Sequence, residues 1–497
     1  MVLLVKHGPA RPVERAYVLD VLLHEFLGLD YEVQIHEGPN TCITLLGDER
    51  QRQLEMPDVL LASPEHHWLH EASLPAEPLA VWHTPSELLC RNSKLSLSVP
   101  VIYGRPTQGR MFDRWDGGIY IGIDVFGSAL FMLARYEELV CTARDRFGRF
   151  PASASVAFRE GFLERPIVNE YVQILWAAIK DLWPQLERRQ RQYQVVLSHD
   201  VDVVSMHGRG FRNVLFSLGA DLFSRRDPLL AVRRLRAYRR TFRDERTLTG
   251  DPYDTFDFIM ETSERSGIRS VFNFIPGRSD PAFDAVYDVG DPVIRSLIRR
   301  IHSRGHQIGF HPSFNTYRDG ARTKAEFARL RQVCDEEGVS QANWGGRQHY
   351  LRWENPITWE NWEDCGLDYD SSLTYPERAG FRSGSCHEHP VIDLRRKTRL
   401  RLRERPLVVM EGSLLSYLSF SLEEAEEKIC DLIDTCRRYD GDFTLLWHNH
   451  MLVSRRARQT YSRIVAMAAG LCREFRPPQK GSGDQHKPCR TQIAHVE

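Results

Sequence analysis

Short apolar runs alternate with helix-like stretches through the second half of this 497-residue chain. The runs are Val195–Leu197, Val271–Ile275, His306–Phe310, Ala342–Gly345, Leu407–Met410 and Phe443–Trp447. The helix-like stretches include Pro292–Ser303, Thr323–Glu337 and Leu422–Tyr439. Strands that alternate with helices form a parallel sheet, because each helix carries the chain back across the sheet. The pattern therefore predicts an α/β fold, with the sheet either open or closed into a barrel.

Four of these runs are followed by a charged or ligand-type side chain. These side chains are Asp200, His311, Arg347 and His448. The active sites of α/β barrels and open parallel sheets are built at the carboxyl ends of the strands. We therefore expect these side chains to meet in one functional site.

Asp200 and Asp202 flank Val201, so an extended backbone sends both carboxylates to the same side. Two neighbouring carboxylates repel each other unless a cation or an arginine lies between them. The pair could form an Asx turn or cap a helix. The functional alternative is that one carboxylate binds a divalent metal while the other acts as a general base.

Other residues in the second half add chemistry to this pair. His311 is a candidate imidazole ligand, and Asn315 lies four residues later, a spacing that can bring two ligands to one metal. An amide is a poorer ligand than imidazole for zinc-like metals. Arg347 could pair with Asp200 and keep it ionised. His448 could protonate a leaving group.

The region from about Tyr193 to Leu471 resembles the NodB-homology group of polysaccharide deacetylases, carbohydrate esterase family four and its relatives. The resemblance rests on five short motifs in the expected order: Leu197-Ser-His-Asp-Val-Asp202, Gly305-His-Gln-Ile-Gly-Phe-His311, Arg347-Gln-His-Tyr350, Tyr369-Asp-Ser-Ser372 and Leu446-Trp-His448. It implies a distorted (β/α) barrel of the NodB type with fewer than eight complete repeats. It also implies removal of an N-acetyl group from a sugar.

The resemblance also implies catalytic roles for four residues. Asp200 would be the general base toward the attacking water, and Arg347 would orient Asp200. The backbone amide of Tyr350 would stabilise the oxyanion, and His448 would protonate the leaving amine. Together these roles suffice for amide hydrolysis without a covalent enzyme intermediate.

The resemblance further implies a divalent metal, for which we expect zinc, with cobalt, nickel or manganese as alternatives. Asp202 and His311 would bind it, and Asn315 stands where the family has a second metal histidine. A nearby imidazole could replace Asn315; the candidates are His306, His349 and His450. We assign substrate binding to Trp353, Asp370 and Trp447.

Residues 1–187 are expected to form a smaller α/β accessory domain, joined to a barrel at 193–475. Its predicted strands are Val2–Val5, Ile43–Leu46, Asp58–Leu61, Pro100–Tyr103 and Ile119–Ile123. Its predicted helices are Asp124–Leu139, capped by Asp124, and Val168–Leu182. The stretch Ile123–Glu138 resembles the marker of a bacterial subgroup of deacetylase-like proteins that carry an extra N-terminal domain.

The formal net charge of −1 argues against a protein devoted to nucleic-acid binding. This total conceals a basic segment, because the stretch from Arg209 to Arg246 contains eleven arginines and only four acidic residues. We expect this helical insertion, at about 208–248, either to pack on the barrel with a solvated arginine face or to dock on an anionic membrane or a lipid-diphosphate-linked glycan. The polar tail 476–497 is expected to be disordered.

These patterns predict a cytoplasmic protein, peripheral at the inner membrane surface if the basic segment docks there. The predicted activity is metal-dependent N-deacetylation of a sugar or glycan precursor in surface-polysaccharide synthesis. Two alternatives remain open at this point. One is a catalytically inactive protein that binds glycan or acts as a scaffold, and the other is an amidohydrolase acting on a small non-sugar amide.

Overall fold

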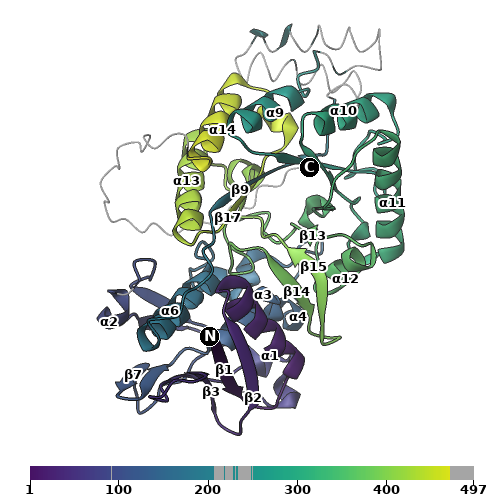
Figure 1. Ribbon diagram of the computed structural model, residues 1–497. Helices are drawn as coiled ribbons and strands as arrows, with labels where there is room; N and C mark the ends of the chain where they lie inside the picture. Colours follow the sequence, from purple (N-terminus) through teal and green to yellow (C-terminus); the bar gives the residue numbers. More distant parts are fainter. Residues whose placement is uncertain are drawn as a thin grey trace.

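A computed structural model describes residues 1–90, 92–205 and 250–470, together with positions 218, 228, 229, 231, 232, 235 and 248. The chain forms two main sheets, one before residue 125 and one after residue 193 (Figure 1). Most of the basic segment 209–246 and the tail 476–497 lie outside the described residues. The predictions for those two segments therefore stay predictions.

The first sheet has six strands in the order β2-β1-β3-β4-β8-β7. Their bounds are β1 (Val2–His7), β2 (Asp30–Ile35), β3 (Asn40–Leu45), β4 (Gln53–Pro57), β7 (Phe112–Trp115) and β8 (Gly118–Ile121). β5 (Ala80–His83) and β6 (Ser98–Val101) form a separate antiparallel pair. The helices of this part are α1 (Pro12–Leu19), α2 (Ser86–Leu89), α3 (Val125–Leu133), α4 (Tyr136–Val140), α5 (Val156–Arg159) and α6 (Ile167–Leu182).

The prediction of a strand at Asp58–Leu61 is wrong, because β4 ends at Pro57. The amides of Val59 and Leu60 donate to the Asp124 carboxylate, at 2.9 and 3.0 Å, instead of to a neighbouring strand. A side chain distant in the sequence has thus taken the hydrogen bonds that a strand would need.

The helix predicted at Asp124–Leu139 begins as expected but is interrupted. Asp124 caps α3 by accepting a hydrogen bond from Gly127 N at 2.8 Å. The helix then breaks at Arg135, whose φ of 51° lies in the left-handed region. The buried Arg135 guanidinium pairs with Glu137 and Glu138 immediately afterwards, so α4 starts in a new direction. The apolar periodicity alone gives no sign of this break.

The second sheet has nine strands in the order β14-β15-β13-β12-β11-β10-β9-β17-β16. Their bounds are β9 (Gln194–Val201), β10 (Ser270–Phe274), β11 (Gln307–Phe310), β12 (Gly345–Gly346), β13 (Tyr369–Asp370), β14 (His389–Asp393), β15 (Thr398–Glu404), β16 (Val409–Met410) and β17 (Asp442–Leu446). Neighbouring strands are parallel except for the antiparallel pair β14–β15. The helices are α9 (Phe256–Arg265), α10 (Pro292–Ser303), α11 (Gly320–Glu336), α12 (Ile357–Asp364), α13 (Leu422–Arg438) and α14 (Arg455–Ala468).

Local sequence explains these elements. Every residue of β10 is buried, as expected for a parallel strand covered on both faces. α10 buries Ile294, Leu297, Ile298 and Ile301, the spacing of one helix face. α13 begins with a capping box formed by Ser421 and Glu424.

The α/β class is confirmed, but the strand pairs of the described residues make an open sheet rather than the predicted barrel. β14 and β16 are its two edges, and no described pairing joins them. The edge strand β16 has only two residues, so it offers few ladder hydrogen bonds with which to close the sheet.

The two parts of the chain share a buried boundary. Ile392 of β14 and the nearby Leu394 belong to the apolar core of the N-terminal part. Tyr17 of α1 donates a hydrogen bond to Pro390 O at 2.8 Å. Of the helices in the described ranges, none has both the length and the apolar composition needed to cross a membrane.

Candidate metal-binding active site

The carboxyl ends of the parallel strands meet at one cavity of about 140 Å³. Its wall includes Asp200, Asp202, His311, His349, Tyr350 and His448. These residues come from the ends of β9, β11, β12 and β17 or directly after them. The structure therefore brings together side chains from the ends of four strands, although Asp200 and His448 lie 248 positions apart in the sequence.

Asp200 is held by a buried arginine, as the sequence predicts. Arg347 Nη1 donates to Asp200 Oδ1 at 2.9 Å, and Asn273 Nδ2 donates to the same oxygen at 2.7 Å. Arg347 is fixed in turn by Ser371 O, at 2.8 Å from its Nε. Burial opposes ionisation of Asp200, but the positive charges of Arg347, His311 and His448 together outweigh it and lower the pKa of that carboxyl. Asp200 is therefore ionised at neutral pH.

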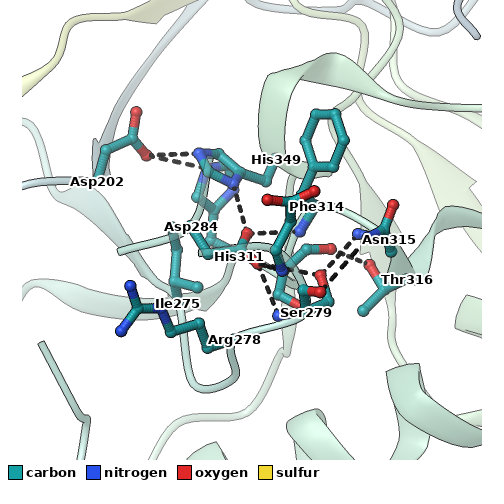
Figure 2. A network of polar contacts seen from close by, with 12 residues as sticks. Asp202, Ile275, Arg278, Ser279, Asp284, His311, Phe314, Asn315, Thr316 and His349 are labelled. Carbon is teal, nitrogen blue, oxygen red and sulfur yellow. Dashed lines mark hydrogen bonds and ion pairs between the residues drawn. The ribbon is translucent and has the colours of Figure 1, made fainter. Parts of the chain in front are cut away.

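Asp202 faces two histidines (Figure 2). Its Oδ1 lies 3.2 Å from His311 Nε2 and 3.6 Å from His349 Nε2. The same oxygen is buried and accepts no hydrogen bond of good geometry from any described residue. Asp202, His311 and His349 offer three ligand atoms within 4.8 Å of one another.

The opposite nitrogen of each imidazole is already engaged. His311 Nδ1 lies 2.5 Å from Arg347 O, which can only accept, so Nδ1 donates. His349 Nδ1 lies 3.2 Å from Asp284 Oδ1, and Phe314 N donates to that carboxylate at 2.6 Å. With Nδ1 as the donor, a neutral imidazole presents the bare Nε2 lone pair to Asp202. Such outer partners orient the histidine ligands of metal ions in proteins.

This donor set fits a divalent metal ion. The Nε2 lone pairs and Asp202 Oδ1 are all acceptors, so they repel each other unless a proton or cation lies between them. Burial disfavours a charged His311, yet the negative charges of Asp200 and Asp202 outweigh it and raise its pKa. The site therefore attracts positive charge, and one carboxylate with two imidazoles is a common set for zinc.

Asn315, the predicted metal ligand, lies away from this cluster. Its Oδ1 accepts from Arg352 Nη1 at 2.9 Å, and its Nδ2 donates to Ser279 O at 3.5 Å. Figure 2 shows Asn315 beside Ser279 and Thr316, across the network from Asp202. His349, one of the three histidines considered as replacements, supplies the second imidazole instead. The other two, His306 and His450, are not members of the cluster.

His448 lies on the other side of Asp202. Its Nε2 is 3.4 Å from Asp202 Oδ2, and its Nδ1 is 2.6 Å from Glu411 Oε1. Burial opposes a charge on His448, but Glu411 and Asp202 outweigh it and raise its pKa well above the usual value. A protonated imidazole at the cavity wall can donate a proton to a leaving group.

Tyr350 lines the cavity in an unusual backbone conformation. Its φ of 59° and ψ of 13° lie in the left-handed region, which non-glycine residues rarely adopt. Leu351, also at the wall, has a φ of 55°. Such strain often accompanies functional sites.

Trp353, Asp370 and Trp447, assigned above to substrate binding, lie in the interior and not on the cavity wall. Trp353 packs against Trp359, with ring centroids 4.8 Å apart. Trp447 packs against Tyr461 at 5.5 Å. Asp370 is fully buried, and its Oδ1 accepts from Ser372 N at 3.0 Å. The rings of Trp353 and Trp447 thus fill the core. Their position next to the sequence motifs does not tell whether they point to the core or to the cavity.

Sequence reasoning overlooked Glu411, Asp284 and Arg149. Glu411 directly follows the apolar run Leu407–Met410, so the strand-end argument applied to that run would have found it. Asp284 and Arg149 carry no such signal. Asp284 lies between β10 and α10, and Arg149 belongs to the N-terminal part.

The comparisons with known proteins include one family model that matches the N-terminal part of the chain. A model for a family of unknown function, DUF7033, matches residues 3–184. No curated protein matches the chain.

Solved structures are similar to rather more than half of the chain. A putative polysaccharide deacetylase from Mycobacterium smegmatis is 14% identical over 57% of this chain and 86% of its own, with a TM-score of 0.37. Puue allantoinase is 11% identical over 56% of this chain and 85% of its own, with a TM-score of 0.35. A probable polysaccharide deacetylase from Pseudomonas aeruginosa PAO1 is 11% identical over the same shares, with a TM-score of 0.34.

Proposed function

We propose that this protein is a metal-dependent hydrolase that removes N-acetyl groups from a sugar or glycan precursor. The observation that carries the proposal is the cluster of Asp202, His311 and His349. Asp200, which accepts a hydrogen bond from Arg347, and His448, which pairs with Glu411, lie beside it. The resemblance of five sequence motifs to NodB-type deacetylases supports the choice of an acetamido sugar as substrate. Setting the reaction in surface-polysaccharide synthesis rests on that resemblance alone.

Asp202, His311 and His349 would hold the metal, for which zinc is the first choice. A divalent ion bound there would polarise the acetyl carbonyl and make water more acidic. Asp200 accepts the proton of the attacking water, because Arg347 keeps this carboxylate ionised and oriented. The Tyr350 amide is the proposed donor to the oxyanion. His448 gives its proton to the departing amine, and Glu411 stabilises the charged imidazole before transfer.

Metal analysis tests the ligand set most directly. The purified protein should contain about one divalent ion per chain, measured by plasma mass spectrometry after removal of loosely bound metal. His349→Ala should lose this ion, whereas Asn315→Ala should retain it, because only His349 belongs to the cluster. Retention by His349→Ala and loss by Asn315→Ala would return Asn315 to the ligand set.

Product analysis tests the reaction. The protein should release acetate from acetamido sugars, and chelation should stop the release. A wild-type protein with neither stoichiometric metal nor acetate release would remove the enzyme proposal and favour a glycan-binding or scaffold role. Release of ammonia or another carboxylic acid from small amides would identify the amidohydrolase alternative.

The membrane or lipid-linked partner of the basic segment 209–246 is a separate part of the proposal. Vesicles that contain anionic lipid should retain the protein at low salt and release it as salt screens the arginines. Failure to bind such vesicles at low salt would contradict the proposed membrane partner and would not affect the proposed hydrolase activity.

A further inference from the structure

One residue of the N-terminal part reaches the wall of the cavity. Arg149 lines it together with residues that all come from positions 200–448. Arg149 is only 4% exposed, although it belongs to the region matched by the family of unknown function. The N-terminal part therefore contributes a side chain to the cavity wall.

A compact turn aims the Arg149 guanidinium. The Asp145 carboxylate accepts from the amides of Phe147 and Arg149, at 2.8 and 2.9 Å, and from Arg149 Nε at 2.8 Å. Asp145 N donates to Arg149 O at 2.9 Å. Gly148 completes the turn with a φ of 77°. Asp145 thus fixes one edge of the guanidinium and leaves Nη1 directed away from the turn.

Nη1 of Arg149 donates to the backbone oxygen of Tyr350 at 2.8 Å. Tyr350 is the residue with the left-handed backbone between His349, a proposed metal ligand, and Leu351. A charge-assisted hydrogen bond to this carbonyl opposes rotation of the strained peptide unit. The bond joins positions 201 residues apart and lies at the cavity wall.

Three further contacts of Phe147 hold the turn beside the site. The Phe147 ring lies 5.5 Å from that of Tyr350 and 5.8 Å from that of Phe283. Arg352 Nε donates to Phe147 O at 2.8 Å, while Asn315 accepts from the same arginine. Asn315 thus braces the turn that carries Arg149.

We infer that Arg149 is a positioning residue of the active site, which holds Tyr350 through its carbonyl, so that the N-terminal part completes the catalytic unit. This inference rests on the proposed hydrolase function. It assigns the region matched by DUF7033 a task in the reaction: fixing the segment that carries both a metal ligand and the oxyanion donor.

The test compares Arg149→Gln and Arg149→Lys with Arg146→Gln, a matched control in the same turn whose side chain is exposed. Arg149→Gln should lower kcat for acetate release about 10- to 100-fold, with KM changed less than about threefold, because positioning acts on the transition state. Metal content should stay at the wild-type value. Arg149→Lys should recover part of the loss, since lysine keeps the charge but not the fork that reaches Asp145 and Tyr350 together.

Hydrogen exchange gives a readout that does not depend on activity. Peptides covering 348–352 should exchange faster in Arg149→Gln than in wild type or Arg146→Gln, with similar exchange elsewhere. Wild-type kcat in Arg149→Gln, an equal loss in Arg146→Gln, or a loss explained by lower metal content would each overturn the inference. If wild type releases no acetate, the proposed function fails, and exchange at 348–352 alone decides the role of Arg149: faster exchange supports it and unchanged exchange overturns it.

Discussion

Two buried clusters of charged side chains in this protein are built in opposite ways. The boundary cluster consists of Arg135, Glu137, Glu138 and Arg382, where the two parts of the chain meet. Arg135 donates to Glu138 and Glu137 at 2.8 Å each, and Arg382 donates to Glu138 at 2.9 and 2.6 Å. In this cluster each carboxylate faces a donor.

The cavity cluster of Asp202, His311 and His349 brings acceptors together instead. The Nδ1 atoms of the two histidines are engaged in hydrogen bonds, while their Nε2 atoms face the Asp202 carboxylate. A buried network with all partners satisfied stabilises one structure. A buried group of unsatisfied acceptors retains the capacity to bind a cation. Both clusters are buried, but the paired charges of the boundary cluster stabilise the fold, whereas the unpaired acceptors of the cavity cluster can bind a ligand.

The largest expected effect comes from removing an acceptor of the cavity cluster. Asp202→Asn should lose the metal and lower kcat/KM by about ten-thousand-fold or more, because metal and orientation are lost together. Metal content and acetate release measure this. Asp335→Asn, an exposed change on α11, is the control. A folded Asp202→Asn variant with full metal content would contradict the assignment of the cavity cluster as a metal site.

The next effect concerns the boundary cluster. Glu138→Gln should lower the free energy of unfolding by about 3–5 kcal/mol, because it takes the carboxylate partner from the buried Arg382 and leaves the buried Arg135 with Glu137 alone. Denaturant titration measures the loss, with Glu427→Gln on the exposed face of α13 as control. Metal content per folded chain should not change. A loss of metal without a loss of stability would show that the two clusters have been assigned the wrong roles.

His448→Gln should separate proton transfer from metal binding within the cavity. We expect kcat to fall about 100- to 1,000-fold, because the leaving amine loses its proton donor, while the metal remains bound. Steady-state kinetics and metal analysis on the same preparation test this, with the exposed His66→Gln as control. Metal loss in His448→Gln would make His448 a ligand rather than an acid.

The smallest effect concerns Asp370, a buried carboxyl that belongs to neither cluster. Burial raises its pKa to about 7. The unfolded chain releases this proton near pH 4 and the folded chain near pH 7, so the group lowers stability as pH rises between those values. Asp370→Asn should therefore gain about 1–3 kcal/mol relative to wild type between pH 5 and 8. Melting curves across that range measure the gain, and a constant difference would contradict it.

Much of the second sheet can be predicted from sequence, because its strands and helices are determined locally. α10 has the predicted bounds, and its buried face follows the apolar spacing of its own residues. The ends of β11 and β17, which precede His311 and His448, also lie within one residue of the predicted ends. Asp200 instead lies inside β9, which runs to Val201, beyond the predicted end at Leu197. Predictions fail where side chains form hydrogen bonds or ion pairs that the local pattern does not indicate. Asp124 accepts from the amides of Val59 and Leu60, and the ion pairs of Arg135 interrupt a helix.

The sequence by itself determined the chemistry available at the strand ends, because parallel strands share one edge and their last residues must gather there. Only the tertiary structure decided which residues complete the site. His349 and Asn315 both stood near the predicted ligands in sequence, but Asp284 turns His349 toward Asp202 while Arg352 draws Asn315 away. Arg149 joins from the other part of the chain through a carbonyl, and every residue has a carbonyl, so no sequence pattern marks that contact.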